Sequence, residues 1–218
     1  RFESIGKLAP GSEPAFAVRR QMVMALQQLK RTDEALALLA RAEQQQPEAS
    51  AVAAIVELRA EVLEESGRWT EAVTALDELV RRYPGSYLAA QATQRQIDLL
   101  REHDDLPGAI ARLKALQPTL SGPYWEVQTQ RELLGLYRAA KQHDQAEDTA
   151  AALLKLTEGT PVGADALLQM ARAQREAGRK KAARQSLEKL VQTYKGGPVV
   201  PMAEALLATW ETEDKAAP

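Results

Sequence analysis

The sequence repeats two residue types at a fixed interval of 37 residues, and this interval constrains the fold more than any other feature. Alanine keeps the interval without a gap, at Ala35, Ala72, Ala109, Ala146 and Ala183. Glycine keeps it with one period skipped, at Gly11, Gly85, Gly122, Gly159 and Gly196. Two residue types locked to one period indicate that a single structural unit has been copied along the chain. Stacked units of this kind present function on a continuous face rather than in one deep pocket.

The composition favours helices and excludes several classes of function. The 218 residues are rich in Ala, Leu, Glu, Gln and Arg, which lose little side-chain freedom in a helix. The net charge of −2 provides no overall attraction to nucleic acid, and we expect no nucleic-acid partner. The absence of cysteine excludes disulfides, thiolate metal ligands and cysteine nucleophiles. No apolar run approaches the roughly 20 residues that span a bilayer, so we expect no direct membrane insertion.

When the sequence is aligned in rows of 37 residues, columns of apolar residues indicate a second helix in each repeat. In the first unit they are Ala35, Leu39 and Ala42, whose spacings of four and three residues put them on one helical stripe. The glycine column follows this helix, so we expect its glycines at the C′ position that closes the last carbonyls. Another column marks a polar turn between the two helices of each unit and contains Lys30, Gly67, Asp104, Lys141 and Gly178.

Capping residues indicate where the helices begin. The expected N-caps of the first helices are Ser12, Ser50 and Ser86, and Pro123 and Pro161 suit a first turn. The expected N-caps of the second helices are Asp33, Thr70, Asp105 and Asp144. Asp105 is the clearest of these, because a proline follows it in the first turn.

We predict an all-α chain, because no segment shows the period-two alternation of a strand. The period predicts about five antiparallel helix pairs within residues 10–197, over 12–47, 49–84, 86–118, 123–157 and 161–195. A last helix over 198–213 is expected to cap the array, and residues 214–218 are expected to form a flexible tail. Residues 1–9 match the end of a second helix and are predicted to be the tail end of a truncated upstream repeat. A short irregular N-terminus is the alternative.

The unit resembles the tetratricopeptide repeat (TPR). That family places a small residue early in the second helix, a large one four residues later, a small or apolar one after three more, and then proline. The first unit matches with Ala35, Leu39, Ala42 and Pro47. The resemblance implies a right-handed α-solenoid whose first helices line a concave face. Residues 82–90, Arg-Tyr-Pro-Gly-Ser-Tyr-Leu-Ala-Ala, resemble junctions of bacterial envelope TPR proteins, which favours a periplasmic or outer-membrane-associated location over a cytoplasmic one.

Residues that carry chemistry are scarce. His103 and His143 lie at or beside turns and lack a second ligand at metal-binding spacing. No phosphate loop, glycine-rich nucleotide motif or nucleophile elbow is present. We therefore expect no enzymatic activity, no cofactor and no metal.

The resemblance implies that a protein or peptide partner contacts the first helices. Carried over by register, the expected contact residues are Arg20, Met24, Gln27, Glu57, Glu61, Glu64, Gln94, Asp98, Arg101, Arg131, Arg138, Leu168, Arg172 and Arg175. This row is acidic in the second repeat and basic in the third to fifth, and guanidinium groups pair well with carboxylates. It predicts a partner segment with basic residues at repeat 2 and acidic residues at repeats 3–5. The alternative is an ordinary solvated face whose charges balance between neighbouring repeats.

Three functions remain open at this point. The leading hypothesis is a non-enzymatic scaffold that binds a partner segment in its concave groove, with bacterial envelope assembly as the expected setting. The second is a ligand- or partner-sensing regulatory TPR domain of a larger signalling or transcription protein. The third is a structural module that associates with itself.

Overall fold

The computed structural model describes residues 13–45, 48–119 and 122–216, and within these residues every regular element is a helix. The chain divides into two compact units, residues 1–104 and 105–218. Unit 1 contains α1 (Glu13–Gln28), α2 (Thr32–Gln44), α3 (Ala49–Glu65), α4 (Trp69–Arg82) and α5 (Tyr87–Glu102). Unit 2 contains α6 (Leu106–Leu116), the short 3-10 helix η2 (Gln117–Thr119), α7 (Pro123–Ala139), α8 (His143–Leu156), α9 (Pro161–Glu176), α10 (Lys180–Thr193) and α11 (Val200–Ala216).

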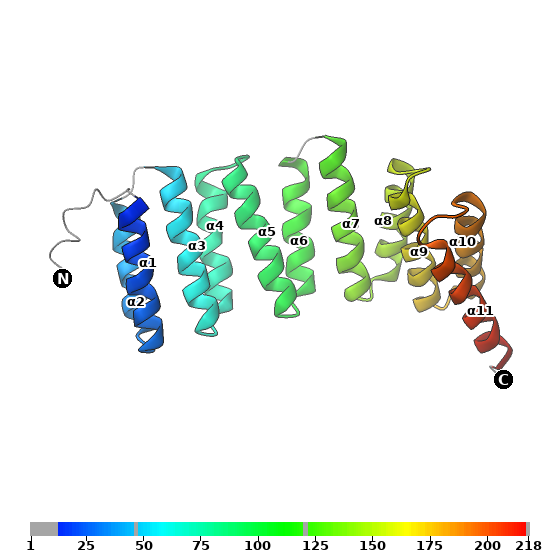
Figure 1. The fold of residues 1–218 in the computed structure, drawn as a ribbon, viewed down its shortest axis with the longest axis horizontal. Coiled ribbons are helices and arrows are strands. Elements are labelled where there is room, and N and C mark those ends of the chain that lie inside the picture. Colours follow the sequence, from blue (N-terminus) through cyan, green and yellow to red (C-terminus); the bar gives the residue numbers. More distant parts are fainter. Residues whose placement is uncertain (1–12, 46–47, 120–121, 217–218) are drawn as a thin grey trace. The chain divides into compact units, whose positions relative to one another are not determined.

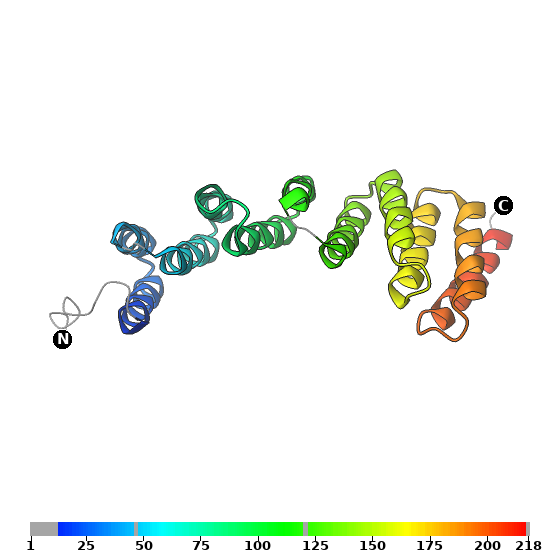
Figure 2. The ribbon, with the colours of Figure 1, turned by 90° about the horizontal axis from the view of Figure 1, so that it is seen from above.

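Within each unit every helix packs against the next one along the chain (Figure 1). This confirms the predicted all-α architecture of consecutive antiparallel helices, as in a TPR solenoid. In unit 1, Figure 2 shows α1, α3 and α5 in one row and α2 and α4 in another. Residues 1–9 and Ser12 lie outside the described residues, and the upstream repeat stays a prediction.

The alanine column is fully buried in the core. All five alanines, from Ala35 to Ala183, have no exposed surface. The large residues four positions later, such as Leu39, Leu76 and Leu187, are equally buried. A methyl group at the alanine position lets the neighbouring helix approach, and the leucines fill the space beside it. The column is therefore a packing requirement and contributes nothing to an exposed site.

The polar-turn column, rather than the glycine column, supplies the left-handed C′ residues. Lys30, Gly67, Asp104, Lys141 and Gly178 all have positive φ, between 55° and 79°. After Gly67, the amide of Arg68 donates to the carbonyl of Leu63 at 2.8 Å, and the same bond joins Arg179 to Gln174 at 2.8 Å. These bonds are those of the Schellman motif, and they close the first helices.

Three glycines of the glycine column, Gly85, Gly159 and Gly196, instead lie in four-residue turns between repeats, whereas Gly122 is the N-cap of α7. The helix before Gly85 ends at Arg82, and the amide of Ser86 donates to the carbonyl of Tyr83 at 3.1 Å. Gly85, at φ 70°, is the third residue of this turn, where a type II turn requires positive φ. The same arrangement recurs at Gly159 and Gly196. The expected C′ role was thus wrong, because these glycines lie two residues beyond the C-cap.

Several predicted helix ends also differ from the structure. The N-cap prediction is confirmed at Ser86 and Asp105, whose side chains accept bonds from Ala89 and Gly108 amides at 3.2 and 3.0 Å. The predicted caps Ser50, Asp33, Thr70 and Asp144 lie inside their helices instead. The Schellman turn is so short that the residue directly after it, such as Arg68, becomes the next N-cap. The last helix continues to Ala216, so residues 214–216, expected in the tail, are helical.

Candidate functional site

The first-helix face of unit 1 carries nine of the expected contact residues. Arg20 and Met24 on α1, Glu57 and Glu61 on α3, and Arg101 on α5 are exposed. The other four are half-buried and are Gln27, Glu64, Gln94 and Asp98. The amide of Gln27 donates to Glu65, which connects α1 to α3 across this face.

A hollow of about 330 Å³ lies between α3 and α5 on this face, and its lining residues are Glu57, Glu61, Gln91, Gln94, Arg95 and Asp98. The structure thus brings together four expected residues from two repeats. Sequence register missed Gln91 and Arg95, each of which lies three residues before an expected position, Gln94 or Asp98. That spacing places them on the same helical stripe, which is the signal that could have found them.

The hollow is electrostatically negative. Partial burial of its carboxyl raises the pKa of Glu57, and the charge of Glu61 one turn away raises it further. Arg95, the basic residue of the lining, is paired with Glu64 beside the hollow. Asp98 is paired with Arg101 at 2.8 Å. Within the described residues Glu57 and Glu61 form no ion pair, so they remain the unneutralised charges of the site.

The arginine row of unit 2 is largely bound to the chain's own carboxylates. Arg138 donates to Glu176 at 2.7 Å and also to Gln169. Arg175 donates to Glu213 and to Asp214, both at 2.9 Å. The hydrogen bond from Arg175 lowers the pKa of Asp214 to about 2, with a further bond from Lys180 in support. These two arginines therefore support the alternative reading, in which charges balance between neighbouring repeats.

The remaining expected residues of unit 2 differ in their accessibility. Arg131 is exposed on α7. The Nη2 atom of Arg172 lies 3.2 Å from the sulfur of Met202 on α11. Leu168 is only 2% exposed and packs in the core among α9, α10 and α11. Leu168 therefore cannot offer its side chain to a partner in this structure, because its position on α9 is turned inward.

The two histidines do not form a reactive centre. His103 is exposed and stacks on Trp69, with ring centroids 4.7 Å apart. The Nδ1 atom of His143 lies 3.7 Å from a Glu176 oxygen. Among the described residues, no cluster of three or more His, Asp or Glu side chains could hold a metal ion. In the same part of the chain, no helix combines the length and apolarity needed to cross a membrane.

Comparisons with known proteins agree with the geometry. A tetratricopeptide repeat model matches residues 20–87 and again 57–121, and a second model of that description matches residues 165–196. These matches together cover more than half of the chain. No curated protein matches it.

Solved structures share the fold at low sequence identity. The C-terminal part of a TPR repeat-containing protein from Cytophaga hutchinsonii is 18% identical, with a TM-score of 0.61 over 97% of this chain and 82% of that chain. BtubC (BKLC) from P. vanneervenii is 14% identical, with a TM-score of 0.53 over 88% and 86%. YrrB, described as a TPR protein with an unusual peptide-binding site, is 16% identical, with a TM-score of 0.52 over 94% and 97%. The chain belongs to the tetratricopeptide repeat family.

Proposed function

We propose that this chain is a non-enzymatic scaffold that binds a segment of a partner protein on its first-helix faces. TPR proteins are generally protein–protein interaction scaffolds and are typically non-catalytic. The observation that carries the proposal is the hollow between α3 and α5, into which Glu57 and Glu61 contribute charges that no basic side chain of the described residues neutralises. A lysine or arginine of the partner is the complement of this site.

The size and composition of the hollow support that choice of partner. A volume of about 330 Å³ is at the lower end of ligand pockets, enough for one long side chain and its flanking backbone. Gln91, which is exposed, adds a hydrogen-bonding amide to the lining. A cation between Glu57 and Glu61 would relieve their mutual repulsion, so binding would return the raised pKa of Glu57 toward its ordinary value.

Unit 2 offers a weaker, oppositely charged contribution. Arg131 and Arg172 form no ion pair within the described part of the chain, whereas Arg138 and Arg175 do. We propose Arg131 and Arg172, on the first helices of unit 2 itself, as contacts for acidic residues of a partner, separate from the hollow of unit 1. Arg138, Arg175 and the buried Leu168 are left out, because their side chains are already engaged within the chain.

The test measures binding of synthetic peptides to the immobilised chain. Three extended peptides of equal length carry lysine, glutamine or glutamate at their centre. We expect the lysine peptide to bind best. The double variant Glu57→Gln/Glu61→Gln should lower the affinity for this peptide about tenfold, which is roughly 1.4 kcal/mol of binding free energy. The loss should fall as salt is added, because exposed charges are screened.

A matched control keeps the change of net charge and moves it away from the hollow. Glu48 and Glu102 are exposed, and neither lines the hollow. The double variant Glu48→Gln/Glu102→Gln should therefore bind the lysine peptide like the original chain. Equal losses in the two double variants would show that only the overall charge matters. A preference for the glutamate peptide would refute the proposed polarity of the site.

The likeness of residues 82–90 to bacterial envelope TPR junctions favours a partner in envelope assembly. In this chain that stretch forms the turn around Gly85 and the start of α5. Localising the full gene product in bacterial cell fractions tests this part of the proposal, and recovery in the cytosol would count against it.

A further inference from the structure

Helix α11 occupies the position of a first helix of another repeat. One period after α9, Pro161–Glu176, gives residues 198–213, and α11 spans Val200–Ala216. The bond from Arg138 to Glu176 on α9 recurs one period later as the bond from Arg175 to Glu213 on α11. The same register therefore places α11 on α9 as it places α9 on α7.

An apolar stripe on α11 covers the face formed by α9 and α10. Val200 and Ala203 are buried in a cluster with Leu168 and Ala171 of α9 and with Leu187 and Leu190 of α10. Leu206, Leu207 and Trp210 pack against this cluster and are half-buried. The stripe shows that the α9–α10 face receives an amphipathic helix.

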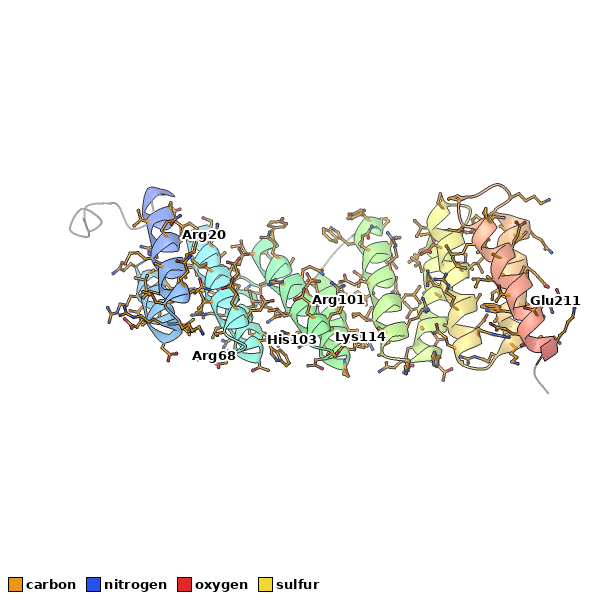
Figure 3. All side chains as sticks on the ribbon, turned by 60° about the horizontal axis from the view of Figure 1, so that its bottom comes forward. Arg20, Arg68, Arg101, His103, Lys114 and Glu211 are labelled. Carbon is orange, nitrogen blue, oxygen red and sulfur yellow. The ribbon has the colours of Figure 1, made fainter. Side chains whose placement is uncertain are left out.

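Charged residues surround the end of this stripe. Arg175 lies over the ring of Trp210 at 5.3 Å and binds both Glu213 and Asp214. Lys180 reaches Asp214 at 2.9 Å, and Arg184 reaches Glu211 at 3.5 Å. Glu211 lies on the last turns of α11 in Figure 3. Three basic side chains of α9 and α10 thus meet three carboxylates of α11. The face therefore favours a helix that carries negative charges at these positions.

Helix α11 is buried on one side only, the side that faces α9 and α10. Eight residues of α9 are buried, whereas Val200 and Ala203 are the buried residues of α11 in the described chain. The positions of α11 that correspond to buried Leu167, Leu168 and Ala171 are the exposed Glu204, Ala205 and Ala208. Few buried contacts allow local opening at low free energy. The carboxylates of these ion pairs are half-buried or exposed, so the pairs weaken as salt is added.

The connection before α11 suits such an opening. It contains Gly196, whose φ is 74°, and Gly197, between the ends of α10 and α11. Two adjacent glycines permit backbone rotation that other residues resist. The connection can therefore absorb the backbone rotation that moves α11 off the face.

We propose that the α9–α10 face is a docking surface for an amphipathic helix with an acidic C-terminal end, and that α11 is its tethered occupant. A partner helix with an apolar stripe and carboxylates at the spacing of Glu211, Glu213 and Asp214 displaces α11 and binds Arg175, Lys180 and Arg184. Competition between α11 and the partner helix therefore regulates binding of the partner to this surface. The proposal goes beyond the scaffold role argued above, because it concerns a different face and does not depend on the unit 1 hollow.

The probe for this surface is a labelled synthetic peptide of residues 198–216, added to the full chain. In the unchanged chain α11 competes for the site. The triple variant Glu211→Gln/Glu213→Gln/Asp214→Asn weakens that competitor and should bind the peptide at least tenfold more tightly than the unchanged chain. Adding Arg175→Glu and Lys180→Glu to the triple variant should abolish the gain. The control Glu204→Gln, on the exposed side of α11, should bind like the unchanged chain.

Several results would overturn the proposal. These are equal peptide binding by the unchanged chain and the triple variant, absence of binding by both, or a gain that survives Arg175→Glu and Lys180→Glu. A concentration-dependent dimer of the triple variant without peptide binding would assign the face to a second copy instead. If the triple variant does not fold, hydrogen exchange of the unchanged chain tests the proposal instead. Amides of α11 should exchange faster than those of α9 and α10, and exchange of all three helices together would equally refute the tethered occupant.

Discussion

The left-handed backbone conformation of Lys141 lowers the stability of the folded chain, and one substitution should remove this cost. Lys141 has a φ of 55°, and its amide donates to the carbonyl of Arg138 at 3.0 Å. The equivalent residue one period later is Gly178, with a φ of 77°. The side chain of Lys141 is exposed and forms no ion pair within the described residues. Lys141→Gly therefore removes the steric penalty of the left-handed conformation and sacrifices no contact.

The expected gain follows from two opposing terms. A side chain in the left-handed region costs about 1–2 kcal/mol, because its Cβ crowds the following carbonyl. Glycine loses more backbone freedom on folding, which offsets about 0.5–1 kcal/mol. The two ranges together give a net stabilisation of about 0–1.5 kcal/mol, with a centre of ~0.75 kcal/mol. For a chain of this length the central value raises the melting temperature by about 1.5–3 °C.

Thermal unfolding followed by circular dichroism at 222 nm measures the effect. Two comparisons sharpen it. Asp104→Gly should gain less, because aspartate tolerates the left-handed region better than lysine. Gly178→Ala should lose about 1 kcal/mol from backbone strain alone, because an added Cβ there meets no atom within 4 Å. A lower melting temperature for Lys141→Gly would refute the reasoning and show that the lysine side chain stabilises the turn.

Two further predictions concern unit 2. Gly163→Ala would stabilise an ordinary helix, but here the added Cβ lies 2.4 Å from the Thr157 carbonyl oxygen and 2.6 Å from the Tyr194 hydroxyl. We expect a net loss of about 1–3 kcal/mol in urea denaturation, and a gain would show that the junction gives way easily. Folding lowers the pKa of Asp214 from 3.8 to about 2, so its stabilising contribution is complete above about pH 5 and is lost progressively as the pH falls toward about 1. The protection factors of α11 amides, which are corrected for the intrinsic exchange rate at each pH, should fall over that interval, and Asp214→Asn should remove most of this pH dependence.

The sequence predicted the architecture because packing leaves few choices at a buried position. A residue larger than alanine at Ala72 or Ala146 would separate two helices, so the column remains the same in every copy of the unit. The order of the helices and the buried leucines followed from this column. Turn chemistry was less accessible, because lysine and glycine fill the same left-handed position at Lys30 and Gly67. Residue type alone therefore assigned the C′ position to the wrong column.

The candidate site could be predicted only in part, because register locates a position and not its neighbours. Register placed Glu57, Glu61 and Asp98 on the first helices, and the structure groups them around one hollow. It could not show that Arg175 forms an ion pair with Glu213. This contact spans 38 residues and depends on how α11 packs. It also placed Leu168 in the row, where the α9 backbone turns the side chain inward.

The repeated units act as an internal comparison that separates packing from specificity. One period links Gln27, Glu64, Arg101, Arg138 and Arg175, so the same place on the first helix carries an amide, an acid and three guanidinium groups. The partner stays the same, because Gln27 binds Glu65 and Arg138 binds Glu176, a glutamate 38 residues further on in both cases. A packing requirement would have selected one residue type there, as it does in the alanine column. Because the fold tolerates all of these side chains, the choice among them is free to encode what each face binds. Gln27→Arg keeps a glutamate partner, Glu65, as Arg138 has Glu176, and should therefore alter peptide preference far more than it alters the melting temperature.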